Sequence, residues 1–201
     1  MSSKRPLYSD TRDRILSTGE NLILGKGFSA LGLAEILSVA AVPKGSFYHY
    51  FSSKEEFGVA LLKRYFAVYD EKMQQLISRE DVGPTQRLFI YFSEWKSLIE
   101  ESHCQKLCLA IKLAAEVADL SAPMRETLAA GMQKITAYIA QLIQMARQQG
   151  ELGDGVAPEV LATSLYSIWT GASLLTKVSR NMSAMQVAET QTRLLLGLPA
   201  H

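Results

Sequence analysis

The sequence predicts an all-α protein, and three observations support that prediction. Apolar side chains recur at i, i+3 and i+4 in one segment after another, which is the spacing of an amphipathic helix. Glycine and proline interrupt this spacing at intervals, as at Gly83–Pro84 and in the segment GELGDG at 150–155. The chain has no internal repeat, heptad run or low-complexity tract. We therefore expect ordinary helices joined by short loops.

Composition and charge set the outer bounds. The chain has 201 residues and is 48% hydrophobic, enough for a sizeable core in one or two domains. The net charge is +1, but residues 1–54 carry seven Lys or Arg and only four Asp or Glu. This asymmetry directs the basic end toward a polyanion. The polar arm with Lys4 and Arg5 is either a floppy tail or a contact to phosphates or the minor groove.

Nothing in the sequence predicts a membrane protein or a secreted one. No apolar run approaches the ~20 residues that span a bilayer, and the first residues have no apolar segment of the signal-peptide type. We expect a cytoplasmic protein. In that reducing compartment the two cysteines are not expected to form a structural disulfide.

The first helix is expected to begin at Asp10 or Thr11 and to end at Gly25 and Gly27. Its apolar positions, with those of the next two short helices, predict a small core. That core is Ile15, Leu22, Phe28, Leu33, Ile36, Leu37, Val42, Phe47 and Phe51.

Two short helices with a tight turn between them follow, over residues 33–39 and 44–50. The second helix can turn only one side inward, through Phe47 and Phe51, so its donors and rings must face solvent or a partner. Small residues at its start permit close approach to DNA, and Lys, Tyr and His reach phosphates and base edges. This composition is typical of the recognition helix of a helix-turn-helix; the alternative is a surface turn rich in aromatics.

The polar residues of this predicted recognition helix, together with Lys54, fall into two groups that we expect to contact different parts of the DNA. We expect one group to hold phosphates: Lys44, Tyr48, His49 and Lys54. We expect a second group to lie closest to base edges: Gly45, Ser46 and Tyr50. The free N–H groups at the start of the next helix reinforce phosphate binding at Lys54.

That next helix is predicted from Lys54 to near Ser78. Ser53-x-x-Glu56 has the spacing of a capping box at its start. At about 1.5 Å per residue it is long enough to leave one domain and enter another. We therefore expect this helix to transmit a change in the second domain to the first.

Further helices are predicted over residues 85–100, 103–118, 121–149, 158–180 and 183–196. Ser102-x-x-Gln105 has capping-box form before the second of these. The apolar stripes of the last two helices exceed what one bundle face needs. They predict a four-helix interface across a two-fold axis, and hence a homodimer.

Cys104 and Cys108 are four residues apart, so we expect them on one helix face. Cys104 would then stand in the first turn, where the helix dipole favours a thiolate. Lys106 and Lys112 would favour a thiolate at Cys108. The alternative is that one or both cysteines are small apolar fillers.

Other chemistry has less support. His103 with the two cysteines offers three possible ligands and no fourth, so no metal site is expected. No strand-turn-helix nucleophile frame or Gly-rich oxyanion loop is present, so we expect neither an enzyme nor a cofactor. A set of helical aromatics lines either a ligand pocket or the core: Tyr91, Phe92, Trp95, Tyr138, Tyr166 and Trp169.

The run AAVPKGSFYHYFSSKEEF, with TRDRILSTGENLILGKGFSALGLAEIL before it, resembles the amino-terminal domain of TetR-type transcriptional repressors over residues 11–60. The resemblance implies an all-helical homodimer with a helix-turn-helix for operator DNA and a larger carboxy-terminal domain that responds to a ligand. It also implies that Lys54 binds a phosphate. The expected division is 1–54 for DNA binding and 55–201 for effector sensing and dimerisation.

Two later segments, LCLAIKLAAEVADLSAPMR and IWTGASLLTKVSR, resemble the NemR-type repressors that sense electrophiles and hypochlorite. That resemblance implies that Cys108 is the sensor. We hypothesise that Lys177 either lowers the pKa of the thiol or traps the oxidised sulfur. Cys104 stays a second candidate. Two alternatives remain open: a repressor that binds a small molecule and has inert cysteines, and a cysteine-dependent enzyme.

Overall fold

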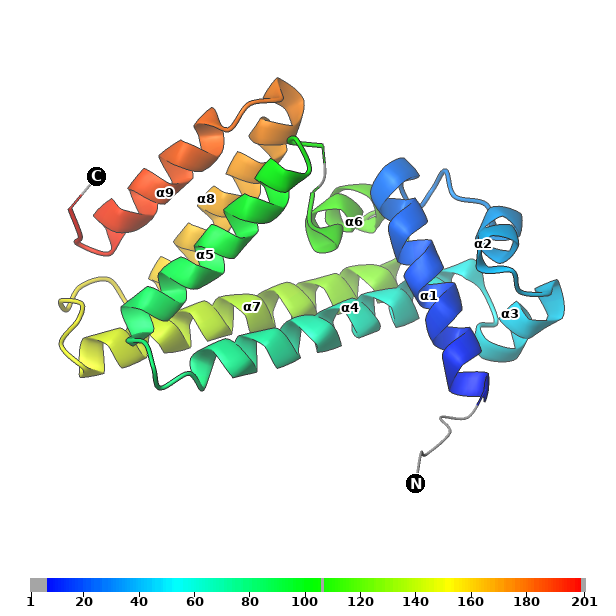
Figure 1. Cartoon of the computed structure of the whole chain (residues 1–201), viewed down its shortest axis with the longest axis horizontal. Helices are drawn as coiled ribbons and strands as arrows, with labels where there is room; N and C mark the ends of the chain where they lie inside the picture. The colour runs from blue at the N-terminus through cyan, green and yellow to red at the C-terminus, as the bar shows by residue number, and fades with distance from the viewer. Residues whose placement is uncertain (1–6, 106, 200–201) are drawn as a thin grey trace. The chain divides into compact units, whose positions relative to one another are not determined.

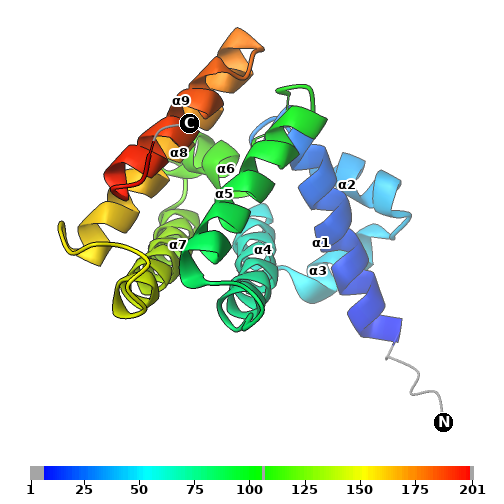
Figure 2. The same ribbon diagram turned by 60° about the vertical axis from the view of Figure 1, so that its left-hand side comes forward.

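The structure is a computed structural model that describes residues 7–105 and 107–199. Over these residues it contains nine helices and no strand, so the all-α prediction is confirmed (Figure 1 and Figure 2). The helices are α1 Leu7–Lys26, α2 Leu33–Ala40, α3 Lys44–Tyr50, α4 Lys54–Ile77, α5 Pro84–Glu101, α6 Leu109–Val117, α7 Ala122–Gln148, α8 Pro158–Ser179 and α9 Ser183–Leu195. None of the helices in this part of the chain combines the length and hydropathy of a membrane span.

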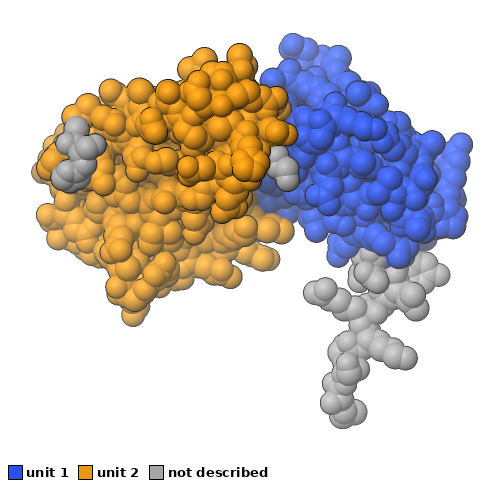
Figure 3. Space-filling view, turned by 45° about the horizontal axis from the view of Figure 1, so that its top comes forward, with its two compact units in different colours: residues 1–67, 108–130 blue, residues 68–107, 131–201 orange. Residues whose placement is uncertain are grey.

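The chain forms two compact units, coloured separately in Figure 3. Unit 1 comprises residues 1–67 and 108–130, and unit 2 comprises residues 68–107 and 131–201. Unit 1 therefore includes the first part of α4, α6 and the start of α7 in addition to the segment 1–54. The functional division at residue 54 is a separate matter and stays a prediction.

In unit 1, α1 packs against α2 and α3 (Figure 1). The core between them is aromatic and aliphatic, with Ile15, Ile36, Phe47 and Phe51 at 0–1% exposure. These four residues were predicted for this core. Three further members of the predicted core, Leu22, Phe28 and Leu33, are only half-buried.

The start of α4 is capped as the sequence predicts. Ser53 Oγ accepts a hydrogen bond from the Glu56 N–H at 3.0 Å, and the Glu56 carboxylate accepts one from the Ser52 N–H at 2.7 Å. The reciprocal bond goes to Ser52 rather than to Ser53, so the box is shifted by one residue. Both bonds satisfy donors that the helix itself leaves free.

The predicted helix over residues 103–118 is wrong at its start. Ser102 ends α5 instead of capping a new helix, and α6 begins only at Leu109. His103 and Cys104 have φ angles of 51° and 59°, in the left-handed region that most non-glycine residues avoid. Their N–H groups bond back to Glu100 and Ile99 carbonyls and close α5.

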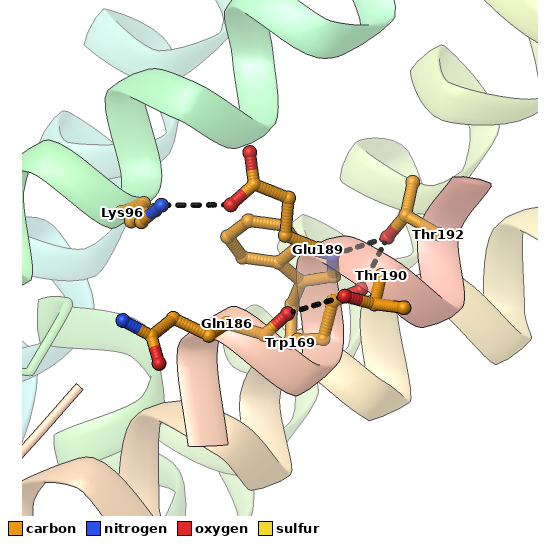
Figure 4. Close-up of polar contacts among 7 residues, drawn as sticks. Lys96, Trp169, Gln186, Glu189, Thr190 and Thr192 are labelled. Carbon is orange, nitrogen blue, oxygen red and sulfur yellow. Dashed lines mark hydrogen bonds and ion pairs between the residues drawn. The ribbon is translucent and has the colours of Figure 1, made fainter. Parts of the chain in front are cut away.

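Unit 2 is built around stacked aromatic rings. The rings of Phe92 and Trp169 lie 4.6 Å apart and nearly parallel. Figure 4 shows the Trp169 indole N–H donating to Thr192 Oγ1, 2.8 Å away, which ties α8 to α9. The same view shows Lys96 of α5 paired with Glu189 of α9 at 2.7 Å. These polar contacts join α9 to α8 and to α5 at defined positions, whereas apolar packing alone is less directional.

Candidate functional site

Helix α3 buries one side chain and exposes most of its polar ones. The Phe47 ring is fully buried, with its centroid 5.2 Å from that of Phe51 and 5.8 Å from that of Phe57. The exposed residues are Lys44, Gly45, Tyr48 and His49, and the half-buried ones are Ser46 and Tyr50. A rigid aromatic base thus presents the surface that the sequence predicted for DNA.

The turn before α3 is held by backbone hydrogen bonds. Ala41 has φ 51°, and the Val42 N–H donates to the Leu37 carbonyl at 3.0 Å. The Val42 side chain is buried, and Pro43 precedes α3 in extended conformation. The angle between α2 and α3 is therefore set by local geometry, as a helix-turn-helix requires.

Gly45 stands in the first turn of α3 without an internal packing reason. A Cβ built on it would meet no atom within 4 Å. Glycine in a helix costs about 0.5–1 kcal/mol relative to alanine, and nothing in the described chain offsets that cost. Gly45 therefore leaves open space beside the first turn of α3, and the close approach of DNA there stays a prediction.

Lys54 is less free than the sequence suggested. Its ammonium lies 4.8 Å from the centroid of the Phe28 ring and 3.4 Å from the Ser29 carbonyl oxygen. Burial lowers the pKa of Lys54, and the nearby Glu116 carboxylate opposes that shift. The Glu56 N–H in the first turn of α4 already has Ser53 as its acceptor. The Lys54 side chain is therefore already bound to the α1–α2 turn, and its contact with a phosphate stays a prediction.

Other basic residues named from the sequence are Lys4, Arg5 and Lys106, and these lie outside the described residues. Arg12 on α1 is half-buried, and its guanidinium carbon lies 5.5 Å from the centroid of Phe51. The positive charge near α3 thus includes a side chain that rests on the aromatic core.

Cys104 is buried in unit 2, in the left-handed turn after α5. Its thiol donates to the Met182 sulfur at 3.5 Å, and its carbonyl accepts from the Arg180 guanidinium at 3.2 Å. Both partners come from the turn between α8 and α9. Cys104 is therefore a packed residue at a helix end, not part of a helical face.

Cys108 belongs to unit 1, where it caps the start of α6. Its sulfur accepts a hydrogen bond from the Ile111 N–H at 3.4 Å. Burial raises the pKa of the Cys108 thiol, and hydrogen bonds from the Ile111 N–H and the Tyr65 side chain oppose the rise. The resting group is therefore a thiol at neutral pH.

The prediction that the two cysteines share a helix face is wrong. Cys104 precedes α6 by five residues, and the helix-start position expected for Cys104 belongs to Cys108. Lys177 is half-buried in the last turn of α8, in unit 2. Its pairing with Cys108 stays a prediction. No three His, Cys, Asp or Glu side chains in the described part of the chain are grouped to hold a metal ion.

Five of the six aromatics considered for a ligand pocket are buried in unit 2, which supports the core interpretation. They are Tyr91, Phe92, Trp95, Tyr166 and Trp169. Tyr138 is half-buried. An open groove of about 540 Å³ lies along α5, and its lining combines the apolar Phe89, Ile90 and Leu98 with six polar or charged residues, Lys72, Gln86, Ser93, Glu94, Ser97 and Glu101.

Sequence reasoning missed Glu116, which organises unit 1. Its carboxylate accepts hydrogen bonds from the Phe28 N–H at 2.8 Å and the Ser29 N–H at 2.7 Å. These partners lie 88 and 87 residues earlier in the chain, so no local pattern announces them. The one local signal is Gly27, where φ is +94° and an added Cβ would approach a Glu116 oxygen to 2.7 Å.

Comparison with protein families and known proteins agrees with this architecture. Residues 15–61 match the family described as bacterial regulatory proteins, tetR family, and residues 84–192 match the tetracyclin repressor-like C-terminal domain. The HTH-type transcriptional repressor NemR of Escherichia coli (strain K12) is 37% identical over 191 residues, covering 95% of this chain and 96% of that protein. The transcriptional regulator AcuR of Cereibacter sphaeroides is 31% identical over 86% of this chain and 79% of that protein.

Among solved structures, the crystal structure of E. coli NemR in its reduced form superposes with a TM-score of 0.86 at 37% identity, covering 96% of this chain and all of that one. The predicted resemblance is thereby confirmed. From its helix-turn-helix at one end to its larger helical region at the other, the chain belongs to the TetR family of bacterial transcriptional regulators.

Proposed function

We propose that this protein represses transcription by binding operator DNA as a homodimer through α3, and that it leaves the operator when its effector acts. The observation that supports DNA binding is the exposed polar surface of α3 on its buried aromatic base. Such a short helix gains specificity by entering the major groove, where each base pair shows a distinct donor and acceptor pattern.

A fluorescence-anisotropy titration tests this part. The probe is a duplex from the region upstream of the chain's own gene, and the control is a scrambled duplex of equal length. We expect tight binding to the first duplex only, with log Kd rising linearly with log salt concentration because phosphate contacts release counterions. Equal affinity for both duplexes would contradict sequence-selective repression.

The homodimer is supported by the surfaces of α8 and α9, which lie side by side in unit 2 (Figure 2). Both helices expose aliphatic side chains, with Leu175 at 63% and Val178 at 83% exposure. The other exposed aliphatic residues on these helices are Val160, Leu174, Val187, Leu194 and Leu195. Such a surface is typical of a subunit interface, and a two-fold axis there would pair two α3 helices for two half-sites one DNA turn apart.

For the effector, we propose that modification of Cys108 drives release. Two observations support Cys108: it stands at the α6 N-terminus, and the Ile111 N–H points at its sulfur. Both stabilise negative charge on sulfur once the proton has left. An α,β-unsaturated carbonyl then forms a bond from its β carbon to the sulfur and takes a proton at its α carbon. With hypochlorous acid, the sulfur gains hydroxyl, and chloride and a proton leave.

We propose a role for Lys177 in the response to hypochlorous acid only. A sulfenic acid on Cys108 condenses with an amine by forming a sulfur–nitrogen bond and releasing water. We propose the Lys177 amine as that nucleophile. Alkylation by a maleimide has no such step, so Lys177 should matter for release by hypochlorous acid and not for release by maleimide.

Operator release by N-ethylmaleimide and by hypochlorous acid, compared in four proteins, tests this. We expect wild type and Cys104→Ser to release with both reagents, Cys108→Ser to release with neither, and Lys177→Met to release only with the maleimide. Normal release from Cys108→Ser would make the cysteine proposal wrong.

A second candidate function is a repressor that binds a small molecule and has inert cysteines. The groove along α5 favours it, because its volume of about 540 Å³ and its mixed lining, with the apolar Phe89, Ile90 and Leu98 beside polar and charged side chains, suit a small amphipathic ligand. In that case a variant with both cysteines replaced by serine would respond to its effector as wild type does.

A further inference from the structure

One side of α6 carries three residues spaced by four, Cys108, Lys112 and Glu116. This spacing places them in a row along the helix. Lys112 Nζ donates to the Leu24 carbonyl oxygen at 2.7 Å. The Glu116 carboxylate accepts from the Phe28 and Ser29 N–H groups at 2.8 and 2.7 Å. All of these groups belong to unit 1.

Lys112 and Glu116 of α6 together replace one backbone hydrogen bond that is missing at the end of α1. The helical series of α1 ends with the Gly27 N–H bonded to the Ile23 carbonyl at 2.8 Å. The next pair in the series would join the Phe28 N–H to the Leu24 carbonyl. Instead, Glu116 accepts from that N–H and Lys112 donates to that carbonyl. Helix ends need such partners, because their unpaired groups are costly to bury.

The same carboxylate influences Lys54. Burial has the largest single effect and raises the pKa of Glu116, but hydrogen bonds from Phe28 and Ser29 and the charge of Lys112 together lower the pKa by more, so the group is ionised at neutral pH. Its negative charge raises the pKa of Lys54, against the larger effect of burial. Lys54 itself rests on Phe28 and Ser29. Glu116 of α6 thus contacts the turn between α1 and α2 and acts electrostatically on Lys54, a residue proposed to bind a phosphate.

We propose that Lys112 and Glu116 are positioning residues for operator binding: together they fix the α1–α2 turn and Lys54 in the arrangement that fits DNA. The proposal rests on the function proposed above. It also connects the α1–α2 turn to Cys108, since the half-buried Cys108 side chain lies at the α6 N-terminus and accepts hydrogen bonds from the Ile111 N–H and the Tyr65 side chain. In this proposal a group added to the sulfur disturbs these hydrogen bonds and shifts the start of α6, and Lys112 and Glu116 move with that helix.

The first experiment measures operator affinity of the unmodified protein for Glu116→Ala, Glu116→Gln, Lys112→Met and Lys112→Arg. Glu126→Ala, an exposed carboxylate in the same unit, is the matched control. We expect a loss of about tenfold for Glu116→Ala and Lys112→Met, within the usual range of coupling between sites. Glu116→Gln and Lys112→Arg, which keep an acceptor or a donor, should lose less. Equal affinities for wild type and all four variants would overturn the proposal.

The second experiment measures amide hydrogen exchange and the effect of N-ethylmaleimide. Exchange at Phe28 and Ser29 should be faster in Glu116→Ala than in Glu126→Ala, with helicity and Tm retained. Maleimide should accelerate the same two amides in wild type. The factor by which maleimide weakens operator binding should shrink in Glu116→Ala and Lys112→Met; a purely structural role would leave that factor unchanged and refute the connection to Cys108.

The two proposals fail in different ways. If wild type binds no operator selectively, the proposed function is wrong. If wild type binds and releases on maleimide, but Glu116→Ala and Lys112→Met bind and release equally well, only the positioning role is wrong. If wild type binds and maleimide changes neither affinity nor exchange, the connection to Cys108 is refuted, and the affinity comparison alone decides the positioning role.

Discussion

The two compact units both bury apolar side chains, but they differ in the side chains that they expose. Unit 1 has an aromatic core under α3 and exposes Lys44, Tyr48 and His49. Unit 2 encloses polar side chains and exposes aliphatic ones on α8 and α9. Its buried polar residues are Arg87, Ser173, Thr176 and Thr192, with Ser121 the one counterpart in unit 1 among the described residues.

This difference in the exposed side chains indicates that the two units bind different partners. A surface of donors on a rigid apolar base suits a hydrated, charged duplex, where contacts replace water and counterions. An aliphatic surface suits a second protein subunit, where removing apolar area from water drives association. The hydrogen bonds that Arg87, Ser173 and Thr192 make inside unit 2 then give the unit a defined packing. If this contrast is right, exposed residues in the two units should affect different measurements.

The largest effect is expected from Leu175→Glu on α8. Burying a leucine at an interface contributes about 1.5–3 kcal/mol, and a carboxylate in its place must be desolvated on both sides of a two-fold axis. We expect a monomer in sedimentation velocity and an operator affinity reduced by more than about 100-fold, because one subunit reaches only one half-site.

Leu98→Glu is the matched control, since Leu98 is 67% exposed on α5. It should stay dimeric. If Leu98→Glu dissociates while Leu175→Glu does not, the dimer interface lies on α5, and the proposed interface on α8 and α9 is wrong.

A smaller effect is expected from Lys44→Ala on α3. Losing one phosphate contact should weaken binding to all duplexes alike, by about tenfold at low salt, and reduce the salt slope by about one. Because Lys44 is exposed, its thermal stability should match that of wild type. Lys72→Ala, exposed in unit 2, should leave operator affinity unchanged; a similar loss there would show that net charge matters rather than α3.

An effect of similar size, on stability rather than on DNA binding, is expected from Arg87→Met in unit 2. Arg87 is 6% exposed, and its guanidinium donates to the Ile77 carbonyl at 2.6 Å and the Val82 carbonyl at 2.8 Å. Leaving these carbonyls without a donor should lower the free energy of unfolding by about 1–3 kcal/mol, measured by urea denaturation. Arg79→Met, which removes only a surface pair with Asp81, should change it by less than about 1 kcal/mol.

The smallest effect concerns pH and Asp70 of α4. Hydrogen bonds from Lys134 and Tyr138 of α7 lower the pKa of Asp70. A carboxyl whose pKa is lower in the folded state stabilises the fold above its unfolded pKa, and that stability is lost as pH falls through the folded value. The Tm of Asp70→Asn should therefore fall less than that of wild type between neutral and acidic pH. Asp154→Asn, in the exposed loop after α7, should follow wild type.

Some features could be predicted from the sequence because they depend on neighbouring residues. The spacing of Leu33, Ile36 and Leu37 requires a helix, and a helix as short as α3 cannot bury both its aromatic and its polar residues. The Ser53-x-x-Glu56 cap and the breaks at Gly27 and Gly83–Pro84 are local as well. The all-α architecture and the exposed polar surface of α3 follow from such local rules, whereas the sequence left the aromatics of unit 2 open between a ligand pocket and the core.

Only the tertiary structure decided where the cysteines and the turn ligands lie. The left-handed backbone at His103 and Cys104 has no glycine to announce it, and the contacts to Cys104 come from Arg180 and Met182, far along the chain. Glu116 reads in sequence as one more charge on a helix, because its partners at Phe28 and Ser29 meet it only after folding. Sequence determines which surface each helix must bury, whereas the pairing of single polar groups across long separations depends on how those surfaces pack.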